Sequence, residues 1–178
     1  NVYIEIFRGT PMIVQSMVIF YGSAQAFNIS LDRTWAAIFI VSINTGAYMS
    51  EIVRGGILAV DPGQFEAATA LGMTHGQTMR KVVLPQVVRN ILPATGNEFV
   101  INIKDTSVLN VISVVELYFT GNTVATQNYQ YFPTFTIIAV IYFVLTFTIT
   151  RILRYIERRL DSDTYTTGAN QMQVKEVK

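Results

Sequence analysis

Cysteine is absent from this sequence of 178 residues, and histidine occurs once, as His75. Without cysteine the chain can form no disulfide and no cysteine-ligated metal site, and one histidine does not make a set of metal ligands. Charge is also scarce, because only 14% of the residues are Asp, Glu, Lys or Arg, against roughly 25% in an average soluble domain. The formal net charge of +1 gives no electrostatic reason to bind nucleic acid. We therefore expect no metal site and no nucleic-acid partner.

Long segments without any charged residue are the first positive feature. Residues 9–31, 34–50 and 117–150 contain no Asp, Glu, Lys or Arg, which gives uncharged runs of 23, 17 and 34 residues. A helix needs about 20 mostly apolar residues to cross the hydrocarbon core of a membrane. We therefore predict an all-α fold, a polytopic membrane helix bundle, with four membrane helices at about 11–28, 34–58, 92–118 and 133–153.

Basic residues flank these segments unequally. Arg8 precedes the first predicted helix, four basic residues lie in or beside the 59–91 loop, and four more follow the last helix. The opposite side has only Arg33, so the count is nine against one. Cytoplasmic loops of membrane proteins carry the excess of Lys and Arg. The chain start, the 59–91 loop and the C-terminus are therefore expected in the cytoplasm.

The same orientation predicts on which side of the membrane the other segments lie. Segments 29–33 and 119–132 are expected to face outward. Residues 1–160 are predicted to form one membrane domain. The tail 161–178 is polar and has no hydrophobic periodicity, so we expect it to be mobile.

The 59–91 loop carries helix signals of its own. Asp61 can cap a helix that has Pro62 at its first position, where a missing N–H costs little. Gly72 suits a left-handed stop at the end of that helix. The first half of the loop is therefore predicted to be a short helix that ends at a glycine corner.

A second short helix is predicted after the corner. Thr74 is followed three residues later by Gln77, the spacing of a capping box. This helix is expected to end near Val83, before Pro85. A rigid helix–glycine–helix loop suits docking into the cleft of a partner protein. It suits catalysis poorly, because it has no nucleophile beside a base.

Enzyme signatures are missing from the sequence. It contains no Gly-x-x-x-x-Gly-Lys-Ser/Thr loop for ATP, no His-Glu-x-x-His zinc motif and no Gly-x-Ser-x-Gly elbow. Each of these motifs supplies a geometry that its chemistry requires. We therefore predict no catalytic residue and no enzyme activity in this chain.

The loop also contains a sequence pattern, made of Glu66, Ala67, Ala68, Gly72, Val82, Leu84 and Pro85. This spacing resembles the EAA loop of the permease subunits of bacterial ABC importers, in which Ile usually stands where Val82 is. Residues 5–11, 47–57 and 104–107 resemble the branch of that family that imports polar amino acids such as histidine, glutamine, arginine and glutamate. The resemblance covers about 3–160.

Members of that family usually have one further helix before the point where this sequence starts. The chain begins with Asn1 rather than Met, so we expect it to be truncated at its N-terminus. A processed terminus is the alternative.

The resemblance implies a transport subunit of the bacterial inner membrane, which is the plasma membrane. Two permease subunits, identical or homologous, would form the translocation pathway for a polar amino acid within the lipid bilayer. Separate ABC ATPase subunits would bind ATP and Mg²⁺, so this chain would carry no cofactor. An extracytoplasmic amino-acid-binding protein would deliver the substrate.

The resemblance also implies roles for single residues. In the family, this loop inserts a short helix into a groove of the ATPase. The small Ala67 and Ala68 would allow close approach, Glu66 would pair with a basic residue, and Gly72 would set the corner angle. The alternative is an ordinary solvated loop helix. The complete set of coupling positions is Glu66, Ala67, Ala68, Gly72, Leu84 and Pro85.

The predicted third membrane helix contains charged residues. Glu98, Asp105 and Glu116 lie 7 and 11 residues apart, close to whole helical turns, so they are expected on one face. A charge inside the membrane costs roughly 2.5–3.5 kcal/mol on insertion scales and usually faces protein or water. This face is therefore a candidate substrate pathway, with the candidate residues Glu98, Asn102, Lys104 and Asp105.

These charged residues could have one of three roles. An amino acid has an ammonium and a carboxylate group, which Asp105 and Lys104 could bind. The charges could instead pair with neighbouring helices and hold the bundle together. They would also serve an ion-coupled secondary transporter or a channel, which is the alternative function.

Overall fold

The computed structural model describes the backbone of residues 2–176 and the side chains of residues 2–159. In that part of the chain every regular element is a helix, which confirms the all-α prediction. The chain divides into two compact units. One unit combines Asn1–Glu51 with Asn97–Thr148, and the other combines Ile52–Gly96 with Ile149–Lys178.

The first three helices are α1 (Val2–Gly9), α2 (Met12–Phe27) and α3 (Arg33–Leu58). The last two confirm the helices predicted at 11–28 and 34–58. α1 is not among the predicted helices, because its eight residues are too few for a membrane span. It ends before Pro11, since the residue preceding a proline is disfavoured in the α conformation. Pro11 itself is extended and stands at the N-cap of α2.

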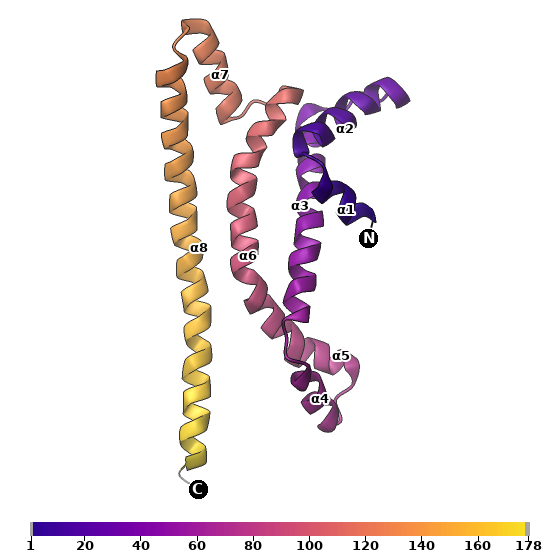
Figure 1. Ribbon diagram of the computed structural model, residues 1–178, viewed down its shortest axis with the longest axis vertical. Helices are drawn as coiled ribbons and strands as arrows, with labels where there is room; N and C mark the ends of the chain where they lie inside the picture. Colours follow the sequence, from indigo (N-terminus) through magenta and orange to yellow (C-terminus); the bar gives the residue numbers. More distant parts are fainter. Residues whose placement is uncertain (1, 177–178) are drawn as a thin grey trace. The chain divides into compact units, whose positions relative to one another are not determined.

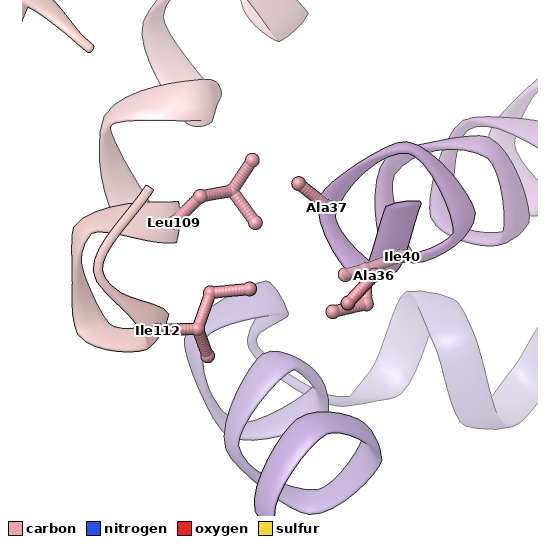
Figure 2. Close-up of a cluster of buried hydrophobic side chains, with 5 residues drawn as sticks. All are labelled: Ala36, Ala37, Ile40, Leu109 and Ile112. Atoms are coloured by element: carbon pink, nitrogen blue, oxygen red, sulfur yellow. The ribbon is translucent and has the colours of Figure 1, made fainter. Parts of the chain in front are cut away.

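The core of the first unit lies where α3 meets the segment after α6. Ala36, Ala37 and Ile40 of α3 are buried against Leu109 and Ile112. Figure 2 shows the Leu109 and Ile112 side chains directed toward the small alanines of α3. Small residues let two helices approach closely, which is how apolar helices pack within a membrane.

Three elements occupy the region of the predicted third membrane helix. They are α6 (Leu84–Asp105), the 3₁₀-helix η2 (Thr106–Ile112) and α7 (Leu117–Asn128). A single helix at 92–118 is therefore wrong. The α-helix begins earlier than predicted and stops at Asp105.

Local side-chain hydrogen bonds explain why the α-helix stops. Thr106 Oγ1 donates to the Ile103 carbonyl at 2.9 Å, and Asn110 Nδ2 donates to the Ser107 carbonyl at 2.6 Å. Such bonds compete with the regular backbone pattern of an α-helix. Ser113 then adopts a left-handed conformation with φ 60° and ends η2.

The last helix, α8 (Tyr131–Glu176), follows α7 after a short turn (Figure 1). It contains the helix predicted at 133–153 and places Pro133 in its first turn, where proline is tolerated. Its backbone remains helical through most of the polar tail 161–178. The side chains of that tail and residues 177–178 lie outside the described residues, so its predicted mobility stays a prediction.

The second unit contains the loop between α3 and α6. Its elements are α4 (Pro62–Ala70), the single-turn helix α5 (His75–Thr78) and the π-helix η1 (Met79–Val83). Val60, Val83 and Val87 form its buried core, and Phe65 and Ile91 are among the residues packed against them. The loop therefore has an apolar core of its own.

The predicted end of the second loop helix, before Pro85, is wrong. The helix continues through η1 into α6, and Pro85 is the second residue of α6. The Leu84 N–H bonds to the Met79 carbonyl, five residues earlier. Proline lacks an N–H and clashes with the carbonyl four residues before it, and a π turn widens the helix at this position. The helix can therefore pass the proline without stopping.

Two helices in the described part of the chain are long and apolar enough to cross a membrane, Arg33–Leu58 and Tyr131–Arg159. A third span is possible if His75–Ile112 and Leu117–Asn128, which meet at 55°, count as one bent span. α2 has 16 residues, which gives about 24 Å of helix against about 30 Å of hydrocarbon. Length and composition therefore support two or three of the four predicted spans.

Candidate functional site

The corner of the 59–91 loop, the candidate coupling loop, is built by backbone conformation. The Asp61 carboxylate caps α4 by accepting a hydrogen bond from the Gly63 N–H at 2.8 Å. After α4 the chain turns at Gly72, which has φ +75°. The Met73 N–H then donates to the Ala68 carbonyl at 3.1 Å. The predicted cap and the left-handed glycine stop are both confirmed.

The second half of the loop starts with a complete capping box. The Thr74 N–H donates to Gln77 Oε1 at 2.9 Å, and the Gln77 N–H donates to Thr74 Oγ1 at 3.4 Å. Both bonds satisfy N–H groups that a helix start leaves unpaired. This confirms the predicted capping box.

The residues of the EAA pattern differ in exposure. Glu66 and Ala67 are exposed on α4, whereas Ala68 is only 3% exposed. α4 packs against α5 and η1. The small side chain of Ala68 is therefore covered by the loop itself, and only Glu66 and Ala67 of this triplet are available to a partner. Leu71, at the corner, is 81% exposed.

Leu84 and Pro85 lie away from the corner, where η1 joins α6. Both are exposed in the isolated chain. The neighbouring Gln86 connects the two halves of the loop, because its amide donates to Gln64 Oε1 of α4 at 3.4 Å and to the Val82 carbonyl at 2.9 Å. The structure thus assigns the pattern to two places, the α4 corner and the start of α6.

The candidate pathway residues on α6 also have different environments. Glu98 is 9% exposed, and Asn102 Oδ1 accepts a hydrogen bond from Thr45 Oγ1 of α3 at 3.1 Å. Lys104 and Asp105 are exposed. Asn102 therefore holds two helices together, whereas Lys104 and Asp105 are free to meet solvent or a ligand.

Glu116 does not share a face with Glu98 and Asp105, which corrects the prediction of a common acidic face. It is the N-cap of α7, and its two oxygens accept hydrogen bonds from the N–H groups of Tyr118 and Phe119 at 2.7 and 2.6 Å. The Tyr142 hydroxyl of α8 also donates to this carboxylate at 3.1 Å. Glu116 is therefore a structural link between α7 and α8.

A polar network around α1 was not foreseen. The Gln15 amide donates to the Phe7 carbonyl and to Thr10, each at 2.9 Å, and Asn44 Nδ2 donates to Gln15 Oε1 at 2.9 Å. Tyr3 donates its hydroxyl to the Ile43 carbonyl at 2.5 Å. These bonds attach α1 and α2 to α3.

An ion pair completes the attachment of α1. Arg8 Nη1 lies 3.4 Å from Glu51 Oε2, and its guanidinium lies over the Tyr48 ring, 5.5 Å from the centroid. Asn44, Tyr48 and Glu51 of α3 thus hold the start of the chain in place. A polar Gln15 within an apolar run was the signal that could have revealed it.

No metal site accompanies these clusters. Among the described residues, no group of His, Asp and Glu side chains could hold a metal ion. The candidate site consists instead of an exposed helix corner, two exposed charged residues on α6 and hydrogen-bonded junctions between helices.

Comparison with known families decides the class. Residues 1–162 match the family described as "Binding-protein-dependent transport system inner membrane component". The chain belongs to this family. It is accordingly a membrane protein of a transport system. The membership favours a permease subunit over a secondary transporter or a channel.

Two relatives of this inner membrane component are known transport proteins. The glutamine transport system permease protein GlnP of Escherichia coli K12 is 41% identical over 160 residues, which are 89% of this chain and 73% of GlnP. The arginine transport system permease protein ArtQ of Bacillus subtilis 168 is 38% identical over 161 residues, which are 90% of this chain and 74% of ArtQ.

A solved structure shares the fold. The crystal structure of an amino acid ABC transporter with histidines has a chain that is 45% identical, with a TM-score of 0.84. The match covers 89% of the inner membrane component and 73% of that chain. At 45% sequence identity, this structural similarity assigns the chain to the ABC transporters.

Proposed function

We propose that this chain is the permease subunit of an ATP-driven importer of polar amino acids. Residues 1–160 form its membrane domain, with four membrane helices that include the short α2 and the bent α6–α7 segment. The excess of basic residues on one side supports a cytoplasmic 59–91 loop and a cytoplasmic C-terminus. The names of the relatives, for glutamine and for arginine, support a polar amino acid as the substrate.

The candidate coupling loop carries the proposal. Its corner is rigid, because a capped helix, a left-handed glycine and a capping box follow one another. It rests on its own apolar core and exposes Glu66, Ala67 and Leu71. A rigid element with an exposed apolar tip and an adjacent carboxylate suits a groove that has a basic rim.

The proposed importer contains further proteins. ABC ATPase subunits bind the loop at Glu66, Ala67 and Gly72 and hold the ATP and Mg²⁺. Leu84 and Pro85, where η1 meets α6, pass the motion of the loop into α6. A second permease copy or homologue and an extracytoplasmic binding protein complete the importer.

The substrate pathway includes the far end of α6. Lys104 and Asp105 are exposed and oppositely charged, so they can bind the carboxylate and the ammonium group of an amino acid. Glu98, further along the helix, is largely buried. Asn102 holds α6 against α3 and so positions the two charged residues.

The test is uptake in proteoliposomes that contain the chain, its ATPase and its binding protein. We expect uptake of labelled glutamine, arginine or histidine only when ATP and the ATPase are both present. Vesicles with the chain alone, given a proton or sodium gradient, are the control. Uptake by that control would contradict the proposal and favour the ion-coupled transporter.

A further inference from the structure

The end of the membrane-spanning part of α8 carries four arginines in nine residues, Arg151, Arg154, Arg158 and Arg159. Arg151, Arg154 and Arg158 follow one another at spacings of three and four, so they lie on one face of the helix. All three side chains are exposed. We call these three residues the arginine stripe.

A neighbouring side of this part of α8 is turned to α6. Leu153 and Glu157 are half-buried. A Cβ added at Gly96 of α6 would lie 3.3 Å from Leu153 Cδ1 and 3.6 Å from Glu157 Oε1. Glu157 is also the single acidic residue in 131–159. The arginine stripe therefore lies on the exposed side of α8, and Glu157, three residues after Arg154, is the acidic residue of that range nearest to it.

The same face of α8 is apolar where the helix crosses the membrane. Val140, Val144 and Phe147 precede Arg151 at helical spacing and are about half-exposed. An exposed apolar face on a membrane span meets lipid tails. The arginine stripe occupies the same face in the next turns of the helix, just beyond the apolar residues. The stripe therefore lies at the depth of the lipid headgroups.

An aromatic residue lies at the same level. Tyr155 is 58% exposed, and its hydroxyl accepts hydrogen bonds from Arg159 Nε and Nη2 at 3.0 and 2.7 Å. Tyrosine is enriched where membrane spans meet water. The bond to Arg159 holds the Tyr155 ring beside the stripe.

We propose that the arginine stripe binds the phosphate groups of anionic phospholipids at the membrane surface where α8 ends. Guanidinium groups bind phosphate in bidentate geometry. Basic residues beside a membrane span attract anionic lipids. The inference concerns α8 alone and does not depend on the importer activity.

The test measures lipid retention by the full chain. The protein is purified from bilayers of equal parts phosphatidylglycerol and phosphatidylcholine, and the retained lipids are counted by mass spectrometry. We expect retention to favour phosphatidylglycerol. The double variant Arg154→Gln/Arg158→Gln should lose this preference by about fivefold or more, since one basic residue near an anionic surface contributes about a factor of five. The preference should also weaken between about 0.01 M and about 1 M salt.

Two matched variants sharpen the test. Arg154→Lys/Arg158→Lys keeps the charge and should retain most of the preference. Arg80→Gln/Lys81→Gln removes the same charge from the exposed loop and should leave the preference unchanged. Should the first double variant fail to insert, Arg154→Gln and Arg158→Gln singly should each give part of the loss.

Three results would overturn the proposal. The first is an unchanged lipid preference in Arg154→Gln/Arg158→Gln. The second is an equal loss in Arg80→Gln/Lys81→Gln, because the stripe would then have no special role. The third is unchanged lipid retention with lost co-purification of the ATPase, which would make the stripe a protein contact.

Discussion

The amide of Asn44 in α3 donates a hydrogen bond of 2.9 Å to Oε1 of Gln15 in α2, and both side chains are buried. The Gln15 amide in turn donates to the Phe7 carbonyl at the end of α1. One pair of side chains therefore joins three helices. Buried polar groups cost free energy unless they are paired, so this pair specifies how the start of the chain packs.

Replacing Asn44 tests this junction. Asn44→Leu removes the donor and leaves Gln15 Oε1 buried without it, which should lower the free energy of unfolding by about 1–3 kcal/mol. The expected result is a lower Tm of the detergent-purified chain. Ser42→Ala, at an exposed position of α3, is the control and should leave the Tm nearly unchanged. Equal Tm values for both variants would show that the junction contributes nothing.

Gly121 tests the packing of α7 against α8. A Cβ at this position would lie 1.9 Å from Ile138 Cδ1 and 2.8 Å from Cγ1. Gly121→Ala should therefore destabilise the chain by about 1–3 kcal/mol, the usual cost of overpacking, with a lower Tm.

A second substitution identifies the cause. Adding Ile138→Val to Gly121→Ala removes Cδ1 and should recover part of the lost stability. Gly55→Ala, in a helix with nothing within 4 Å of the added Cβ, should be neutral or slightly stabilising. A neutral Gly121→Ala would mean that the two helices are not in close contact.

Asp105 tests the pathway assignment. Asp105→Asn keeps the shape and removes the charge, so binding of the substrate ammonium group should weaken. Hydrogen bonds to charged groups contribute about 1.5–3 kcal/mol, which predicts a fall in uptake of about tenfold or more. Arg33→Gln, an exposed charge at the start of α3, is the control. Loss of assembly with the ATPase, with no separate effect on uptake, would instead indicate a structural role.

The absence of cysteine makes the orientation easy to test. Two single cysteines are introduced at exposed positions. Thr69→Cys changes a residue of α4, and Gln130→Cys changes a residue of the turn between α7 and α8. A membrane-impermeant maleimide should label Gln130→Cys in intact cells and Thr69→Cys only after the membrane is opened. Labelling of Thr69→Cys from outside would reverse the orientation derived from the basic residues.

Local signals predicted the candidate coupling loop well. Asp61, Gly72 and the Thr74–Gln77 box act within a few residues of one another, and each took the predicted conformation. The continuation of the helix past Pro85 was not predictable, because it depends on a π turn that has no recognised sequence signature. Ala68 was expected to allow close approach of a partner, but it is buried, because α4 folds back against α5 and η1.

Contacts between residues far apart in the sequence explain the other differences between the predicted and the observed structure. α1 is short and is held in place by residues of α2 and α3, and the polar Gln15 within an apolar run is the one local signal of this attachment. The acidic face predicted for Glu98, Asp105 and Glu116 assumed one continuous helix. The hydrogen bonds of Thr106 and Asn110 end that helix, and Glu116 consequently caps α7.

The central claim is that the corner at Gly72 transmits the work of an ATPase, and ATP-driven uptake by Gly72→Val proteoliposomes tests it most directly. The matched control is Gly76→Val, since Gly76 has no positive φ and open space around it. Valine is strongly disfavoured at φ +75°, so Gly72→Val should distort the corner. We predict that Gly72→Val inserts normally but loses ATP-driven uptake, whereas Gly76→Val keeps it. Normal uptake by Gly72→Val would contradict the account.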